Sequence, residues 1–347
     1  MSVPRAGLRE LAPYRSPQPP ADVRLNTNES PYPPSPAFRE ELADAVRQVD
    51  LNRYPDREAG ALREALARHT GHPFQGTWVA GGSNEVIEQL LLAYGGPERG
   101  VVVFEPTYEL HRRLAWIAHS PVRPVPLPEP WTIGPDDVER ALAARPRVVF
   151  VCSPNNPTGN AQPVGVVRRL ASASDALVVV DEAYVEFGGE SALPLVRAHP
   201  NVVVVRTFSK AFALAGARIG YCLAPPQVVD DLRRVRLPYH LSALTQVAGL
   251  VALRHAAEAG PVLAEIRAER DRILTELRAM GVRAFPSQAN FVLFRPEKPA
   301  AEVWARLLER GVLVRDVSEV VPDCLRVTAG TRTEVDRFLE TLEEVLR

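Results

Sequence analysis

The chain has 347 residues, 46% of them hydrophobic and 24% charged, with a formal net charge of −1. These values are typical of soluble globular proteins and exclude disordered, collagen-like and low-complexity chains, and the length predicts one large domain or two. The 41 basic residues include only two lysines, Lys210 and Lys298, so the other 39 are arginines. A lysine amine can lose its proton whereas a guanidinium cannot, so lysine chemistry is the first possibility to test, with codon bias as the alternative.

Other features exclude several functional classes. Cys152, Cys222 and Cys324 are far apart, which argues against a disulfide framework and a cysteine metal site, and no histidine spacing predicts metal ligands. The first thirty residues lack the apolar stretch of a signal peptide, and no 18-residue apolar run could span a membrane. The arginines alternate with acidic residues and form no basic stripe. We therefore expect a soluble cytoplasmic protein without a metal, nucleic-acid or membrane partner.

Between Thr77 and Ala224, short β-branched apolar runs alternate with amphipathic segments. This pattern predicts an α/β fold, a large domain with a mostly parallel sheet flanked by helices. The predicted strands are Trp78–Ala80, Val101–Phe104, Val122–Pro126, Val148–Cys152, Leu177–Val180, Val202–Arg206 and Ile219–Leu223. The predicted helices are Asn84–Tyr94, Tyr108–Ala118, Pro135–Ala144, Val164–Ala173 and Val228–Val235.

The rest of the chain predicts a smaller, two-layer α+β C-terminal domain. A helical stretch, Thr245–Met280, has a weak point at Gly260-Pro261, where we expect a kink. The elements expected after it are strands near Val282–Phe285, Phe291–Phe294, Val312–Arg315 and Leu325–Thr328, and helices at Ala300–Arg310 and Thr333–Leu346.

The first forty or so residues are rich in proline and predict an arm, without regular helix or central strand. We divide the chain into the arm with the start of the small domain (residues 1–47), a large cofactor-binding domain (48–240) and a small C-terminal domain (241–347).

Polar loops follow four of the predicted strands, at the sheet edge where open α/β proteins bind ligands. They read Glu-Pro-Thr-Tyr (residues 105–108), Ser-Pro-Asn-Asn-Pro-Thr-Gly (153–159), Asp-Glu-Ala-Tyr (181–184) and Thr-Phe-Ser-Lys (207–210). Lys210 is therefore expected at the mouth of the sheet. Lys298 lies in a loop, where we expect it to be exposed to solvent.

A partly desolvated lysine can form a Schiff base with a carbonyl, and the surrounding residues suit pyridoxal phosphate. Asp181, at the end of a buried strand, could keep the pyridine nitrogen of that cofactor protonated, although a helix cap is the commoner role for such a residue. The segment Gly81-Gly82-Ser83-Asn84-Glu85 follows a strand and opens a helix, so it could bind the phosphate together with Arg218. Taken singly, these are also ordinary turn and surface residues.

Four motifs together resemble those of the fold-type I pyridoxal-phosphate aminotransferases: Asn156-Pro157-Thr158-Gly159, Asp181-Glu182-Ala183-Tyr184, Ser209-Lys210-Ala211-Phe212 and Gly216-Ala217-Arg218-Ile219-Gly220. The resemblance implies that Lys210 binds pyridoxal 5′-phosphate covalently and then moves the proton between Cα and C4′. It implies that Asp181 pairs with the pyridine nitrogen and that Tyr108 stacks on the ring. The other implied contacts are Tyr184 and Asn156 to the ring oxygen, and Ser83, Asn84, Thr207, Ser209 and Arg218 to the phosphate.

Within that superfamily the chain is most similar, along nearly its whole length, to the histidinol-phosphate aminotransferases. The motifs that carry this likeness are Leu11–Tyr14, Leu25–Glu29, Arg53–Asp56, Ser287–Phe291, Val314–Asp316 and Leu325–Gly330. The likeness implies an obligate homodimer in which Tyr54 contacts the partner's cofactor phosphate and Tyr14 the partner's substrate. Glu29 is implied to lie at the substrate site. Arg315 and Arg326 are implied to bind the anionic end of the substrate.

The implied activity is transamination of L-histidinol phosphate with 2-oxoglutarate and glutamate as the other pair, a step in histidine biosynthesis. The motifs leave open an aminotransferase for aromatic or other α-amino acids, in which Arg326 would bind an α-carboxylate. A decarboxylase of a phosphorylated amino acid and a non-catalytic cofactor-binding module are further alternatives. Asn84 departs from the acidic residue usual in the family, and we expect this change to tune cofactor affinity rather than abolish it.

Overall fold

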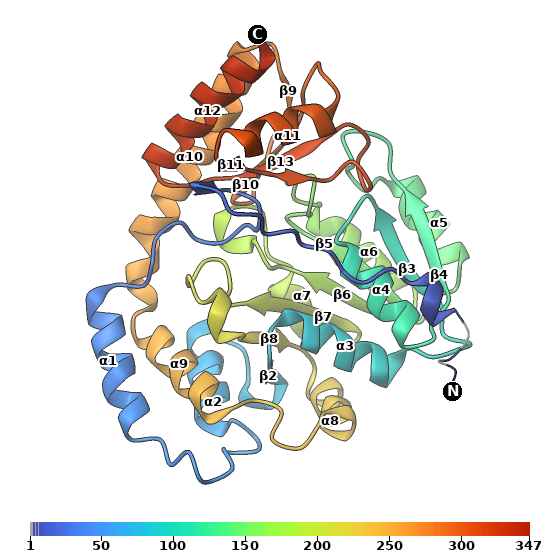
Figure 1. The fold of residues 1–347 in the computed structure, drawn as a ribbon. Coiled ribbons are helices and arrows are strands. Elements are labelled where there is room, and N and C mark those ends of the chain that lie inside the picture. Colours follow the sequence, from blue (N-terminus) through green and yellow to red (C-terminus); the bar gives the residue numbers. More distant parts are fainter. Residues whose placement is uncertain (1–2, 4, 6) are drawn as a thin grey trace.

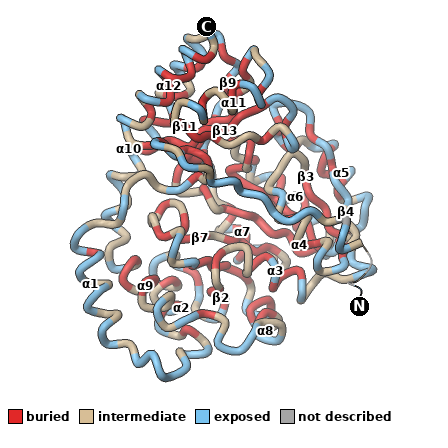
Figure 2. Tube along the Cα trace, viewed as in Figure 1, coloured by how far each residue is buried: buried red, intermediate tan, exposed pale blue. Residues whose placement is uncertain are grey.

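The protein is described here by a computed structural model that covers residues 3, 5 and 7–347. The strands of its large sheet are β2 (Thr77–Ala80), β3 (Val101–Glu105), β4 (Val122–Pro126), β5 (Val148–Cys152), β6 (Leu177–Asp181), β7 (Val202–Thr207) and β8 (Gly220–Leu223). Their order is β2-β8-β7-β6-β5-β3-β4; β8 is antiparallel to both neighbours, and the other pairs are parallel. The predicted α/β sheet is confirmed. Figure 2 shows its central strands buried, in keeping with their valine-rich sequences.

Helices cover both faces of this sheet (Figure 1). On one face pack α3 (Ser83–Tyr94), α4 (Glu109–Ile117) and α8 (Pro226–Val235). On the other pack α2 (Gly60–Thr70), α5 (Pro135–Ala143), α6 (Val164–Ala173), α7 (Leu193–Ala198) and α9 (Ala243–Arg254). Alternate residues of each strand enter the two hydrophobic clusters, so the side-chain alternation of the strands builds both cores. The helices α2 and α7 were not predicted from the sequence.

A second sheet is built from the C-terminal part of the chain. Its strands, β9 (Arg283–Ala284), β10 (Phe291–Arg295), β12 (Arg315–Asp316) and β13 (Leu325–Thr328), pair antiparallel in the order β12-β13-β10-β9. The helices packed with it are α10 (Ala259–Ala279), α11 (Ala300–Glu309) and α12 (Arg332–Leu346). The two-layer α+β arrangement agrees with the sequence analysis, while the exact domain boundaries stay a prediction. In the described part of the chain, no helix is both long and apolar enough to cross a membrane.

The N-terminal arm crosses the molecule between the two sheets, as the blue trace in Figure 1 shows. It contributes β1 (Val23–Arg24), which pairs parallel with β11 (Val312–Leu313). The prediction that the first forty residues hold no regular helix is wrong at its end, because α1 (Pro36–Arg47) begins there. Proline at the first helical position needs no backbone donor, and Ser35 caps the helix by accepting from the N–H of Phe38 at 3.0 Å.

Two further expectations differ from the structure: the position of a helix break and the extent of one strand. The stretch 245–280 does not kink at Gly260-Pro261. The helical stretch breaks at His255 instead. Gly260 and Pro261 lie in the first turn of α10, where proline is tolerated. The expected strand 312–315 is split, because β11 pairs with β1 and β12 pairs with β13. Short 3₁₀ helices lie at Leu8–Glu10, Phe74–Gly76, Val185–Phe187, Ala215–Ala217 and Ala256–Glu258.

The break between α9 and α10 is held by an imidazole placed between two carboxylates. The Nδ1 of His255 lies 2.7 Å from Glu258 Oε1, and its Nε2 lies 2.6 Å from Glu41 Oε2 on α1. Arg254 also donates to Glu41. The hydrogen bonds to Glu258 and Glu41 raise the pKa of His255, so the folded state favours its charged form.

We expect His255→Gln to destabilise the protein more at about pH 6 than at about pH 9. A raised folded pKa gives stability that is present below the ordinary histidine pKa of about 6.5 and is lost as pH rises through the folded value. Urea unfolding at both pH values measures the difference. His199→Gln is the control, because the His199 ring makes no ion pair within the described residues. A pH-independent difference would show that His255 contributes by packing alone.

Candidate active site

A cavity of about 420 Å³ opens at the carboxyl ends of the parallel strands. Its walls come from the loops after β3, β5, β6 and β7, from the start of α3, from the arm and from β12 and β13. The structure brings together here every predicted site residue except Tyr54, namely Tyr14, Glu29, Ser83, Asn84, Tyr108, Asn156, Asp181, Tyr184, Thr207, Ser209, Lys210, Arg218, Arg315 and Arg326. Residues more than 300 positions apart in the chain therefore share one pocket.

Lys210 lies just beyond β7 and projects its amine into this cavity. Its Nζ donates to the backbone carbonyl of Thr27 in the arm at 3.0 Å. Burial, together with the nearby Arg326 and Arg218, lowers the pKa of Lys210 to about 8, and Glu29 opposes this shift. The neutral, nucleophilic amine is therefore much easier to form here than on an exposed lysine, and arginine could not provide it.

Lys298, the other lysine, differs from its expected solvent exposure. It is half-buried and donates to the carbonyl of Val345 in the last turn of α12, at 3.0 Å. A cation at a helix C-terminus stabilises the carbonyls that lack helical partners, so this lysine has a structural role.

Asp181, the last residue of β6, is buried and paired with His111 of α4. The Nε2 of His111 lies 2.9 Å from Asp181 Oδ2, and the Oδ1 accepts from the N–H of Ala183 at 3.2 Å. The imidazole is fully buried and stacks on Phe150, with ring centroids 4.5 Å apart. These contacts fix the orientation of the carboxylate at the floor of the cavity.

A group of hydrogen-bond donors that could form a cradle for an anion lies where α3 begins. The side chains there include Thr207, whose hydroxyl is 2.9 Å from Ser209 Oγ, and Arg218, which donates to Ser209 Oγ at 3.3 Å. Gly82 has a φ of 100°, and a Cβ built on it would lie 2.5 Å from the Arg218 guanidinium. Backbone N–H groups at a helix start, two hydroxyls and a guanidinium are the donors that bind phosphate.

Two tyrosines, Tyr108 and Tyr184, line the cavity together with Lys210 and Asp181. The Tyr184 hydroxyl accepts from Asn28 Nδ2 at 2.9 Å, and burial raises the pKa of Tyr184 to about 12. The Tyr108 hydroxyl donates to Asn84 Oδ1 at 3.3 Å. Asn84 therefore serves as a hydrogen-bond acceptor at the position that departs from the family pattern, so its amide is compatible with the cradle.

The side of the cavity toward the small domain is cationic. Arg326 of β13 donates to Asn156 Oδ1 at 2.5 Å and to the carbonyl of Asn26 at 2.8 Å, and its buried Nε has no hydrogen-bond partner among the described residues. Burial lowers the pKa of Arg326 to about 10. Arg315, which also lines the cavity, donates to the carbonyl of Arg15 in the arm at 2.9 Å. An unpaired buried N–H beside a second guanidinium suits an anionic ligand.

Tyr54 is the predicted residue that the structure leaves outside this cavity. Its side chain is 80% exposed and stacks on Tyr239, with ring centroids 4.3 Å apart. Tyr54 is therefore not among the described residues that line the cavity within one chain.

Comparisons of the sequence with known proteins point to one family over nearly the whole chain. The sequence profile of the family "Aminotransferase class I and II" matches residues 20–342. The chain belongs to this family. Histidinol-phosphate aminotransferases of Thermobifida fusca and Frankia casuarinae are each 48% identical to it, over 97% and 99% of this chain and 94% and 90% of theirs.

Solved structures give the same result for the fold. The aminotransferase is similar to a putative histidinol-phosphate aminotransferase from Erwinia carotovora atroseptica (TM-score 0.87, 28% identity, 95% of this chain and 98% of that one). It is also similar to the histidinol-phosphate aminotransferase from Sinorhizobium meliloti in complex with pyridoxal-5′-phosphate (TM-score 0.83, 29% identity, 94% of this chain and 92% of that one). The fold is that of the fold-type I pyridoxal-phosphate enzymes, as predicted.

The cavity of this aminotransferase fits pyridoxal 5′-phosphate, the cofactor of its family. A buried amine with a lowered pKa, a buried carboxylate and a phosphate cradle line one cavity, as the aldehyde, the pyridine nitrogen and the phosphate of that cofactor require. Among residues 3, 5 and 7–347, no three His, Cys, Asp or Glu side chains are arranged to hold a metal ion.

Two polar residues of this aminotransferase site were not singled out by the sequence analysis. His111 lies three residues after Tyr108 in a predicted helix, and its only sequence signal is a polar residue on a face that should be buried. Asn28 has a φ of 55° and is held by Thr328 and Asn290. That left-handed backbone, which asparagine tolerates, directs its side chain to Tyr184.

Proposed function

We propose that this aminotransferase transfers the amino group of L-histidinol phosphate to 2-oxoglutarate, forming glutamate, as a step in histidine biosynthesis. The observation that carries this proposal is the 44–48% identity to relatives named histidinol-phosphate aminotransferase over nearly the whole chain. The paired guanidinium groups of Arg315 and Arg326 support it, because both substrates carry an anionic group.

Each protein group has a distinct task in this proposal. When bound, pyridoxal 5′-phosphate supplies a carbonyl that accepts the amino group and a ring that stabilises negative charge at Cα. Lys210 would hold this carbonyl, and its neutral amine would accept the proton of the substrate Cα. Asp181, oriented by His111, holds a proton at the ring nitrogen. Ser83, Asn84, Thr207, Ser209 and Arg218 bind the phosphate, Tyr184 and Asn156 the ring oxygen, and Tyr108 the ring face.

The substrate contacts complete the site. Arg326 and Arg315 bind the phosphate of histidinol phosphate in one half of the reaction and a carboxylate of the 2-oxo acid in the other. Glu29 and Tyr14 lie at the open side of the cavity, where the substrate enters. In this proposal, the contacts of these four side chains orient the substrate so that its Cα faces Lys210.

Genetic rescue tests the proposed reaction. Expression of the chain in a bacterial strain that lacks its own histidinol-phosphate aminotransferase is expected to restore growth without histidine. The Lys210→Ala variant, made at the same level, is the matched control and is expected not to restore growth. Continued dependence on histidine, with the wild-type protein present and loaded with cofactor, would contradict the proposal.

An aminotransferase for aromatic or other α-amino acids remains the second candidate. The observation in its favour is the fold shared with Thermus thermophilus aspartate aminotransferase, whose maleate-bound structure is 28% identical with a TM-score of 0.82. In that case Arg326 would bind an α-carboxylate. A decarboxylase and a non-catalytic module receive no comparable support from the relatives.

We further propose a homodimer in which Tyr54 reaches the partner's site. Tyr14, which the family likeness assigned to the partner's substrate, lines the cavity of its own chain instead. Exposed apolar side chains gather on two neighbouring loops: Leu51 and Tyr54 on one, Leu237 and Tyr239 on the other. Such a patch on a soluble enzyme indicates a protein interface. We also propose that the enzyme works in the cytoplasm, where its three free, buried cysteines stay reduced.

Mixing two inactive variants tests the shared site. Lys210→Ala and Tyr54→Ala are each expected to lose most activity, because each removes one component of both sites in a homodimer. Co-expression is expected to restore about a quarter of the wild-type activity, since half of the dimers are hybrids with one intact site. If Tyr54 served its own chain's site, the hybrid would contain no intact site and no activity would return.

A further inference from the structure

A buried hydrogen-bonded chain runs from the base of β2 to the glycine turn that opens α3. The Trp78 Nε1–H donates to Gln89 Oε1 at 2.7 Å, and Gln89 Nε2 donates to Glu85 Oε1 at 2.9 Å. The other oxygen of Glu85 accepts from the backbone N–H of Gly81 at 2.6 Å. Trp78 and Gln89 are almost completely buried, so the bond between them is shielded from water, while the bonds of Glu85 are half-buried.

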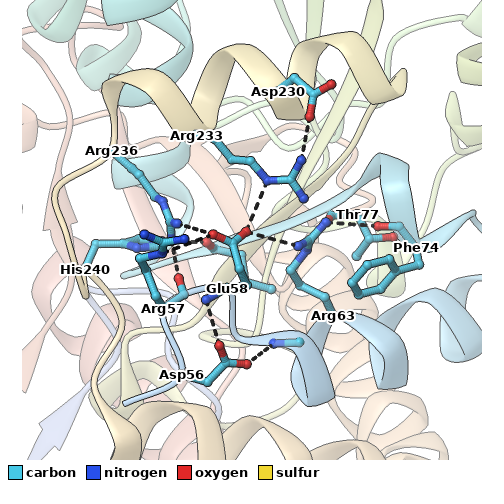
Figure 3. Close-up of polar contacts among 12 residues, drawn as sticks. Asp56, Arg57, Glu58, Arg63, Phe74, Thr77, Asp230, Arg233, Arg236 and His240 are labelled. Carbon is cyan, nitrogen blue, oxygen red and sulfur yellow. Dashed lines mark hydrogen bonds and ion pairs between the residues drawn. The ribbon is translucent and has the colours of Figure 1, made fainter. Parts of the chain in front are cut away.

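These hydrogen bonds begin at Trp78, and a cluster of arginines around Glu58 lies beside it (Figure 3). Glu58 accepts from Arg233 at 3.1 Å and from Arg236, and the buried Arg63 lies 3.6 Å away. Arg63 also donates to the carbonyl of Thr77, the first residue of β2, at 2.7 Å.

The same cluster holds the Trp78 ring. The guanidinium carbons of Arg63 and Arg236 lie 5.7 Å and 5.3 Å from its centroid, and His240 stacks on it with centroids 5.5 Å apart. The indole is therefore fixed by cation–π and stacking contacts. Its N–H therefore holds a fixed position, from which it orients the side chains of Gln89 and Glu85.

The Gly81-Gly82 turn needs contacts from other residues to hold its conformation. Gly81 and Gly82 have no side chains to restrict them, yet Gly82 must keep a φ of 100° while a neighbouring glycine, Gly220, packs against it without room for a Cβ. The N–H groups of Ser83 and Asn84, which follow at the start of α3, have no backbone partner in the part of the chain that the structure describes. A phosphate is bound tightly only if these donors are already in place.

We propose that Trp78, Gln89 and Glu85 are positioning residues that fix the Gly81-Gly82 turn and so set the affinity of the enzyme for its cofactor's phosphate. By donating to Glu85, Gln89 keeps the carboxylate on the Gly81 N–H. Without it, the carboxylate is free to leave the turn and to approach the phosphate, which it would repel. The inference rests on the proposed placement of the phosphate at this turn.

The test compares pyridoxal 5′-phosphate with pyridoxal, which has the same aldehyde but no phosphate. Calorimetric titration of the apoenzyme gives both dissociation constants. Gln89→Leu is expected to raise the dissociation constant for pyridoxal 5′-phosphate about tenfold, equivalent to about 1.4 kcal/mol, and to leave that for pyridoxal within about twofold. Trp78→Phe keeps an aromatic ring, though a smaller one, and removes the indole N–H, so the ratio of the dissociation constant for pyridoxal 5′-phosphate to that for pyridoxal is expected to rise about threefold.

Two control variants distinguish the positioning role from the placement of the phosphate at the glycine turn, on which it rests. Glu88→Gln, on the exposed face of α3, is expected to keep the wild-type ratio. Arg218→Gln is expected to raise it, because that side chain is proposed to bind the phosphate itself. Loss of affinity for both ligands alike in Gln89→Leu and Trp78→Phe, or an unchanged ratio in both, would overturn the positioning role. If Arg218→Gln also left the ratio unchanged, the placement of the phosphate would fail as well.

Discussion

Replacing Lys210 with arginine is expected to lower kcat at least about 10⁴-fold, while the protein stays folded. Arginine preserves the positive charge and most of the length of the side chain. It cannot lose its proton, however, and so can neither bind the cofactor carbonyl nor accept the proton from Cα. The pKa of Lys210, lowered to about 8, brings the neutral amine, which arginine cannot supply, within reach near neutral pH.

The measurement is kcat with saturating cofactor, together with borohydride reduction and peptide mass mapping. Wild-type protein is expected to carry the cofactor on the Lys210 peptide, and the variant is expected to carry none. Lys298→Arg is the matched control, because that lysine caps α12 at a distance from the site and arginine can donate to the same carbonyl. A Lys210→Arg enzyme with kcat within tenfold of wild type would refute the assignment.

Arg326→Lys is expected to reduce kcat/KM about 100-fold, chiefly by raising KM for both substrates of the pair. A lysine keeps one charge but loses the planar guanidinium, which contacts Asn156 and Asn26 and whose Nε has no partner among the described residues. The cofactor should bind with unchanged affinity, because this side chain is not assigned to the phosphate cradle.

Steady-state kinetics with each substrate varied in turn checks this effect. Arg337→Lys, on the exposed side of α12, is the control and is expected to leave KM unchanged. An unchanged KM in Arg326→Lys would show that the anionic groups of the substrates bind elsewhere.

The sequence was most informative where strands end in polar residues. Asp181 and Lys210 follow continuous valine-rich runs, and a parallel sheet brings the carboxyl ends of such runs to one edge. The pattern of the strands therefore sufficed to predict that these two side chains share a site. The resemblance to aminotransferases added the identity of the cofactor.

Tertiary contacts decided what the sequence analysis missed. His111 pairs with Asp181 across 70 residues, and α1 begins at a proline that reads as a helix breaker unless its place at the first helical position is known. The division of 312–315 into two short strands depends on β1, a partner from the arm. Tyr54 stayed outside the cavity, and its proposed role requires a second copy of the chain.

Competition between amino donors tests the central claim most directly. Purified holoenzyme receives 2-oxoglutarate with equal, limiting concentrations of L-histidinol phosphate and L-phenylalanine, and mass spectrometry follows the loss of each amine. The proposed function predicts that histidinol phosphate is consumed at least about tenfold faster, with one glutamate formed per molecule lost. Faster consumption of phenylalanine, or consumption of histidinol phosphate without glutamate formation, would contradict it.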